Sequence, residues 1–104
     1  MTTTTPSPVT RLALSGLTLD AIQAEATRAH LRHGTHSLLN PDMSDGERLA
    51  ILTEEIGEVA HALTYDSGTD DTGIELQIEL IQVAAVAASW VEALTRAPSG
   101  GEAL

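Results

Sequence analysis

The fold is decided by two stretches, 49–63 (LAILTEEIGEVAHAL) and 74–94 (IELQIELIQVAAVAASWVEAL). In the first, apolar residues recur every three or four positions, which places them along one side of an amphipathic helix. These residues are Leu49, Leu52, Ile56, Val59 and Leu63. The second stretch is apolar around nearly its whole circumference, as is typical of a helix that is buried on several sides. The two stretches therefore predict an all-α fold.

The composition agrees with a helical core and limits the possible partners. The chain has 104 residues, enough for one domain, and 42% of them are hydrophobic with no Phe, so the core is aliphatic. The net charge is −10, with five Arg and no Lys, which disfavours nucleic acid and anionic membranes as partners. The absence of Cys excludes disulfides and thiolate metal sites. The apolar run 83–91 is too short to span a membrane, and we expect a cytoplasmic protein.

Turn and capping residues divide the chain. Residues 1–17, rich in Thr and Pro, predict a disordered tail, residues 18–96 a helical domain, and residues 97–104 a flexible C-terminal tail. The first helix is expected from Thr18 to His33, with Thr18 or Asp20 as its cap. Gly34 is expected to end it in the left-handed conformation.

Two capping boxes mark the starts of the later helices. Ser44 precedes Glu47 by three residues, and Thr72 precedes Glu75 by three, as the reciprocal cap requires. The result is a short bundle of three main helices per chain. Because three short helices cannot bury the last one on all its apolar sides, we expect homo-oligomerisation to a homodimer or homotetramer.

Acidic residues at helical spacing suggest a cation site. Glu55 and Glu58 lie three residues apart on one predicted helix, and Glu79 and Gln82 repeat the spacing on the other. Antiparallel packing of the two helices would bring the four oxygen-bearing groups together. Mg²⁺ prefers oxygen ligands and is usually completed by substrate phosphates. The spacing alone favours a solvated acidic face over a metal site.

These residues carry a resemblance to a known family. The segments LTEEIGEVAHAL and IELIQVAAVAASWVEAL are similar to the MazG-like, all-α NTP pyrophosphohydrolase family, over about residues 18–96. That family has Glu-x-x-Glu on one helix and Glu-x-x-Asp on the next. The first motif matches at Glu55 and Glu58, and the second at Glu79, whereas Gln82 replaces the final Asp. An amide oxygen can ligate Mg²⁺ but contributes no charge.

The resemblance implies an oligomeric, Mg²⁺-dependent enzyme, with Mn²⁺ as a substitute, that hydrolyses a (d)NTP to the monophosphate and pyrophosphate. It implies metal ligands at Glu55, Glu58 and Glu79, with Gln82 at the fourth position. Glu54 or Glu55 would polarise the attacking water. Nucleotide contacts are expected from Arg28, His30 and His33. Their residue types alone fit equally a helix C-terminus whose cations favour the helix dipole.

Two other functions are compatible with the sequence. Gln82 favours a catalytically silent helical module for nucleotide binding or assembly. Glu58 and His61 form a Glu-x-x-His pair, the element of dimeric di-iron carboxylate bundles, which Glu79 or Glu55 would complete. His61, however, points about 170° away from the apolar side of its helix, whereas di-iron ligands project into a bundle core. We interpret Arg48 as a surface ion-pair partner.

Overall fold

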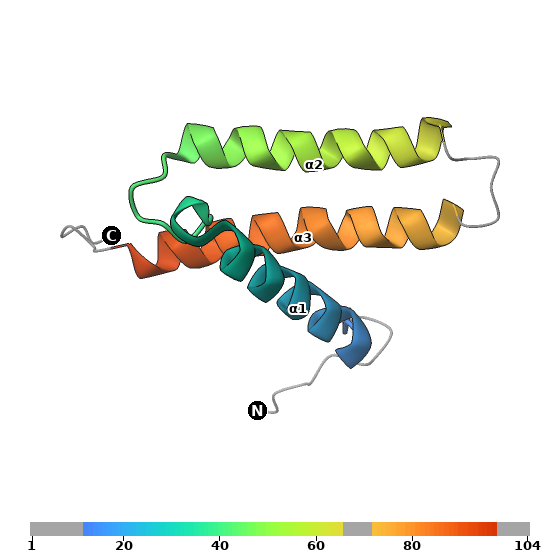
Figure 1. Ribbon diagram of the computed structural model, residues 1–104. Coiled ribbons are helices and arrows are strands. Elements are labelled where there is room, and N and C mark those ends of the chain that lie inside the picture. Colours follow the sequence, from blue (N-terminus) through green and yellow to red (C-terminus); the bar gives the residue numbers. More distant parts are fainter. Residues whose placement is uncertain (1–11, 66–71, 98–104) are drawn as a thin grey trace, which may run out of the picture.

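The computed structural model describes residues 12–65 and 72–97, and no strand occurs in this part of the chain. Three α-helices are present, α1 (Gly16–His33), α2 (Asp45–Tyr65) and α3 (Thr72–Arg96), with a short 3-10 turn η1 (Gly34–His36) after α1. Figure 1 shows α2 and α3 side by side and antiparallel, with α1 crossing α3 obliquely. The prediction of an all-α fold with three main helices is confirmed.

The helix α3 is the centre of the arrangement. Both α1 and α2 pack against it. Within the described residues α1 and α2 do not pack against each other, so they diverge from the shared helix. This geometry leaves space between α1 and α2, above one side of α3.

The helix α1 begins earlier than predicted. Its cap is Ser15, whose Oγ accepts a hydrogen bond from the Thr18 backbone N–H at 3.2 Å, and the prediction of Thr18 or Asp20 as cap is wrong. Ser is a favoured cap because its short side chain reaches the third helical N–H. Gly16 and the residue after it, which we assigned to the tail, are therefore helical. Residues 1–11 and 98–104 lie outside the described part, so their predicted disorder stays a prediction.

The C-terminus of α1 depends on a glycine, as predicted. Gly34 has φ 56°, a value that L side chains rarely adopt, and its N–H donates to the His30 carbonyl. Its ψ of −117° lies outside the left-handed helical region, so the expected conformation is only partly correct. The chain continues from Gly34 into η1 instead of leaving directly into an extended loop.

The capping box of α2 forms as predicted. The Glu47 N–H donates to Ser44 Oγ at 3.0 Å, and the Ser44 N–H donates to Glu47 Oε1 at 2.8 Å. Two orphan N–H groups are thus satisfied reciprocally. The second box, at Thr72 and Glu75, stays a prediction because the Thr72 side chain is not among the described ones. Residues 66–71 also lie outside the described part of the chain.

Arg48 holds the connection between η1 and α2 in place. It is buried, with 5% of its surface exposed, so its interpretation as a surface residue is wrong. Its Nε donates to the Leu38 carbonyl at 2.9 Å and its Nη2 to the Asn40 carbonyl at 2.8 Å. Asp45 accepts from both Arg48 Nη1, at 3.4 Å, and Trp90 Nε1, at 2.9 Å. The start of α2 is thereby joined to the loop and to α3.

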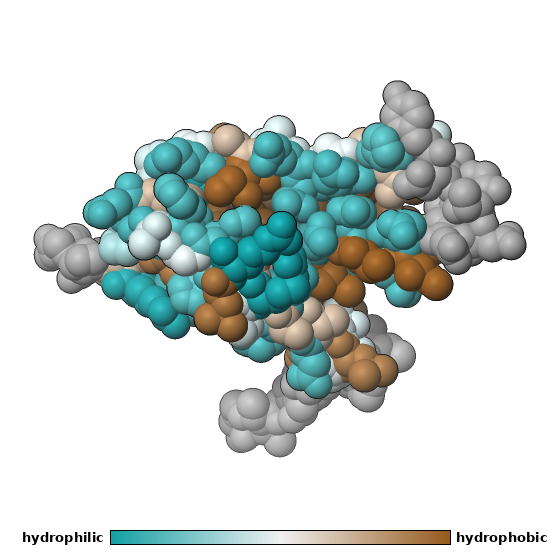
Figure 2. Space-filling view, in the orientation of Figure 1, coloured by the Kyte–Doolittle hydropathy of each residue, from teal (hydrophilic) through white to brown (hydrophobic). Residues whose placement is uncertain are grey.

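The core of the single chain is small. Its buried hydrophobic residues, in the described part, are Ala62, Ala85 and Val86. Many larger apolar side chains remain exposed, including Ile78, Leu80 and Val91 on α3. Figure 2 shows part of this apolar surface. By length and composition alone, the segment Gly73–Arg96 is long and apolar enough to cross a membrane. The run 83–91, on which the sequence analysis was based, is shorter. Core helices of soluble proteins can have the same length and hydropathy.

Candidate functional site

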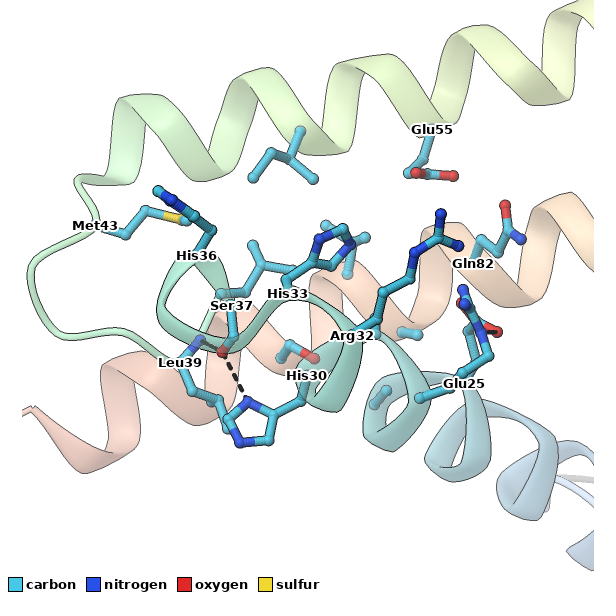
Figure 3. A pocket seen from close by; sticks show the side chains of 18 of the residues that line it. Glu25, His30, Arg32, His33, His36, Ser37, Leu39, Met43, Glu55 and Gln82 are labelled. Atoms are coloured by element: carbon cyan, nitrogen blue, oxygen red, sulfur yellow. Dashed lines mark hydrogen bonds and ion pairs between the residues drawn. The ribbon is translucent and has the colours of Figure 1, made fainter.

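A cleft of about 690 Å³ lies between the three helices and the turn that follows α1 (Figure 3). Its walls differ in chemistry. The α1 and η1 wall carries the Glu25 carboxylate, which pairs with Arg28, together with imidazole and guanidinium groups, namely Arg28, His30, Arg32, His33 and His36. The α2 wall contributes the carboxylates of Glu47, Glu54 and Glu55, and α3 supplies Gln82, Ala85, Val86 and Ser89. Cationic and acidic groups therefore face a common space over an aliphatic floor.

Three predicted metal ligands meet between α2 and α3, and two of them, Glu55 and Gln82, line this cleft. One terminal atom of the Gln82 side-chain amide lies 3.0 Å from Glu79 Oε1 and 3.1 Å from Glu55 Oε1. When the amide NH₂ group occupies that position, it donates a hydrogen bond to both carboxylates. Rotating the amide by 180° places its oxygen next to the two carboxylates instead. The groups bound nearby determine which of the two amide orientations is adopted. Gln82 thus connects a carboxylate on each helix.

The surroundings of Glu55 disfavour its ionised form. Its side chain is half-buried. Desolvation raises the pKa of Glu55 above its ordinary value, and the negative charges of Glu79, Glu58, Glu25 and Glu54 raise it further. Burial and like charges both disfavour the ionised form. A cation bound here would offset this repulsion, because it would add positive charge beside Glu55.

The fourth predicted ligand, Glu58, is placed differently. It is exposed on α2, one turn beyond Glu55. Its negative charge repels that of Glu55 and so contributes to the raised pKa of Glu55. Among the described residues, no three His, Asp or Glu side chains gather closely enough to hold a metal ion as they stand. The structure therefore brings together Glu55, Glu79 and Gln82, and leaves Glu58 at the margin. Glu54, predicted to be catalytic, is exposed and lines the cleft beside Glu55.

The predicted nucleotide contacts on α1 have distinct surroundings. Arg28 donates two hydrogen bonds to Glu25, one of them from Nε at 2.9 Å. Hydrogen bonding to Arg28 lowers the pKa of Glu25. His30 Nδ1 and the buried Ser37 Oγ share a hydrogen bond of 2.8 Å, and Ser37 Oγ also accepts from the Leu39 N–H at 3.0 Å. His33 lines the cleft wall and points toward α2 (Figure 3).

Two of the basic residues that line the cleft were not predicted as site residues. Arg32 and His36 both line the cleft, and Figure 3 shows both side chains turned toward the α2 side. His36 was indistinguishable in the sequence from a solvated loop histidine. Arg32 belongs to the basic group 28–33, and its distance of four residues from Arg28 places both on one helical face. That spacing was the available signal.

The Glu58–His61 pair, which suggested a di-iron bundle, lies on the exposed side of α2. Both residues are exposed in the single chain, as the orientation of His61 predicted. Neither lines the cleft. This placement gives the di-iron alternative no support beyond the sequence motif.

Comparisons of this chain with protein-family models, with curated proteins and with solved structures found no match. The site is therefore interpreted from its own residues and geometry, and membership of the MazG-like family remains a prediction from the sequence motif.

Proposed function

We propose that this chain is a MazG-like nucleotide pyrophosphohydrolase, which hydrolyses a (d)NTP to the monophosphate and pyrophosphate with Mg²⁺ as its cofactor. The observation that supports this most is the cluster of Glu55, Glu79 and Gln82, of which Glu55 and Gln82 line a cleft that arginine and histidine side chains face from the other wall. Phosphates and a hard cation are the ligand classes that such walls accommodate.

The donor set fits Mg²⁺ by chemical type. Glu55, Glu79 and Gln82 offer only oxygen ligands once the amide is rotated, and burial together with neighbouring negative charges raises the pKa of Glu55. These three residues would hold the ion, with Glu58 available from the next turn of α2. When bound, Mg²⁺ would neutralise phosphate charge and increase the acidity of a water molecule.

The chain's own groups would perform the remaining steps. Glu54 is exposed on the cleft wall beside Glu55, where its carboxylate can accept a proton from the attacking water. The water oxygen would form a bond to phosphorus while the anhydride bond between the α and β phosphates breaks. Pyrophosphate would leave with the bonding electrons. The aliphatic floor at Ala85 and Val86 would hold the rest of the substrate away from bulk water.

The second candidate function is nucleotide binding without turnover. It is favoured by the two hydrogen bonds that the Gln82 amide can donate to Glu55 and Glu79, since they satisfy the carboxylates without a metal ion. An acidic residue at this position would repel both neighbours and would require the ion. Binding of nucleotide with no pyrophosphate release would support this candidate.

We also propose that the functional unit is a homo-oligomer. The exposed apolar residues of α3, with Ile78 44%, Leu80 48% and Val91 62% exposed, provide a surface that a second copy can cover. An extended apolar surface of this kind marks an interaction site in most proteins. The net charge of −10 and the acids on α3 agree better with a protein partner than with an anionic lipid surface.

The test of the proposed activity is a product assay. Pyrophosphate release is measured from a panel of NTPs and dNTPs, with Mg²⁺ and with a chelator. Release that requires Mg²⁺ and leaves the nucleoside monophosphate establishes the reaction. Absence of release from every nucleotide, with nucleotide binding retained, would replace it with the binding function.

A further inference from the structure

The cleft has two ends of different polarity. Figure 3 shows Leu39 and Met43 at one end, with His36 beside Met43, and Glu55, Gln82 and the side chain of Arg32 at the other. A ligand with an uncharged ring at one end and an anionic group at the other matches this arrangement. The two ends also define which part goes where.

Arg32 differs from the other described arginines in its bonding. Arg28 is held by Glu25, Arg96 Nε donates to Glu92 Oε2 at 2.7 Å, and Arg48 is buried against loop carbonyls. Arg32 makes no ion pair with any residue in ranges 12–65 and 72–97. Its side chain extends from α1 across the cleft toward Glu55 and Gln82 (Figure 3). A guanidinium that has no protein partner and lines a cleft is free to bind an anion.

Resting on the function proposed above, we infer that Arg32 binds the phosphate chain of the substrate and so sets its orientation. The phosphates lie at the end formed by Arg32 and Glu55, and the base lies against Leu39 and Met43. A guanidinium binds phosphate through two parallel N–H groups, whereas Lys provides a single point charge. Arg28 is a poorer candidate because a phosphate would have to displace Glu25.

The phosphate contact is tested by measuring the Kd of inorganic tripolyphosphate and of a non-hydrolysable NTP analogue by calorimetry, with Mg²⁺ present. The substitution Arg32→Gln is expected to raise both Kd values about 10- to 100-fold, as the loss of a charged hydrogen-bonding group implies. Arg32→Lys should recover only part of this loss. Arg96→Gln is the matched control, since it removes an exposed arginine outside the cleft, and should change neither value.

The orientation is tested with the apolar end. Met43→Ser is expected to weaken binding of the NTP analogue several-fold and to leave the Kd of tripolyphosphate unchanged. Equal weakening of both ligands by Met43→Ser would contradict the assigned orientation. An Arg32→Gln protein with normal helicity that binds tripolyphosphate as tightly as the wild type would overturn the inference, and so would a wild type that does not bind tripolyphosphate.

The outcomes separate this inference from the proposed activity. If the wild type releases no pyrophosphate but binds tripolyphosphate in an Arg32-dependent way, the proposed function fails and the phosphate site stands. If the wild type releases pyrophosphate and Arg32→Gln has an unchanged KM and kcat, the inference fails and the proposed function stands.

Discussion

Gln82 on α3 connects to Glu55 on α2, with its side-chain amide 3.1 Å from Glu55 Oε1. The same amide lies 3.0 Å from Glu79 Oε1, one turn earlier on its own helix. A neutral side chain thus stands between two carboxylates that repel each other. In the ion-free protein it donates hydrogen bonds to both, and in our proposal its oxygen turns toward the cation instead.

We predict that two substitutions at Gln82 change the Mg²⁺ affinity in opposite directions. Gln82→Asp places a third charge beside Glu55 and Glu79, so the metal-free protein should lose stability while Mg²⁺ binds more tightly. Gln82→Leu removes both hydrogen bonds without adding charge, which should cost about 1 kcal/mol of stability and also weaken Mg²⁺ binding. Thermal unfolding with a chelator and Mg²⁺ calorimetry measure the two quantities. Equal Mg²⁺ affinity in the wild type and both variants would show that Gln82 does not contact the ion.

Activity provides a separate check on this position. Gln82→Asp is expected to preserve or raise Mg²⁺-dependent turnover, because an additional carboxylate strengthens the donor set. A large loss of turnover, with tighter Mg²⁺ binding, would show that the amide has a role of its own.

The raised pKa of Glu55 predicts a pH-dependent loss of stability in the metal-free protein. Below the ordinary value of 4.5 Glu55 is protonated in both the folded and the unfolded state and contributes nothing. As the pH rises above 4.5, the unfolded state ionises first, so folding loses stability until the pH passes the raised pKa. Glu55→Gln should therefore be more stable than the wild type at neutral pH, and the difference should vanish at low pH.

Chemical denaturation of both proteins across pH 4 to 8, with a chelator, measures this difference. Glu25 and Glu47, whose pKa values are lowered by Arg28 and by Ser44, lose stabilising ionisation below 4.5 in both proteins, so their effect cancels. A difference in unfolding free energy that does not change with pH would contradict the assignment of Glu55.

We predict that Arg48→Ala destabilises the protein by about 2 kcal/mol, because the Leu38 and Asn40 carbonyls lose a buried charged donor. The matched control is Arg96→Ala, whose exposed ion pair with Glu92 should contribute less than about 0.5 kcal/mol. Urea unfolding reports both values. Similar small effects of the two substitutions would show that Arg48 does not hold the loop.

We expect the exposed apolar surface of α3 to mediate self-association, and a charge introduced on this surface should disrupt the oligomer. Val91→Glu places a carboxylate on a residue that is 62% exposed, and sedimentation velocity should show its conversion from oligomer to a smaller species. Gln77→Glu adds the same charge at an exposed polar position of the same helix and should leave the assembly unchanged. A wild type that sediments as a monomer would refute the proposed oligomer.

Local patterns in the sequence were sufficient for the three helices and for the approach of Glu55, Glu79 and Gln82, whereas the expected convergence of Glu58 with them did not occur. The Ser44–Glu47 box predicted the start of α2 because both partners lie within one turn of helix. Glu55, Glu79 and Gln82 were brought together by two helical repeats and a short connection. Each of these inferences required only periodicity and antiparallel packing.

Contacts between distant residues could not be predicted in this way. The burial of Arg48 depends on the path of the loop after η1, which no periodic pattern encodes. The partner of His30 is Ser37, across the turn that Gly34 makes possible, so no local pattern indicated that this imidazole forms a hydrogen bond. The cap at Ser15 was missed because several Ser, Thr and Asp residues compete near that helix start.

The most direct test is pyrophosphate release from the best nucleotide of the panel by the wild type and by Glu55→Gln, with saturating Mg²⁺ and with a chelator. We predict Mg²⁺-dependent release by the wild type and a loss of at least about 100-fold in Glu55→Gln, with unchanged helicity, as the removal of a charged group from a catalytic site implies. Near-normal release by Glu55→Gln would contradict the assignment of this carboxylate to the site.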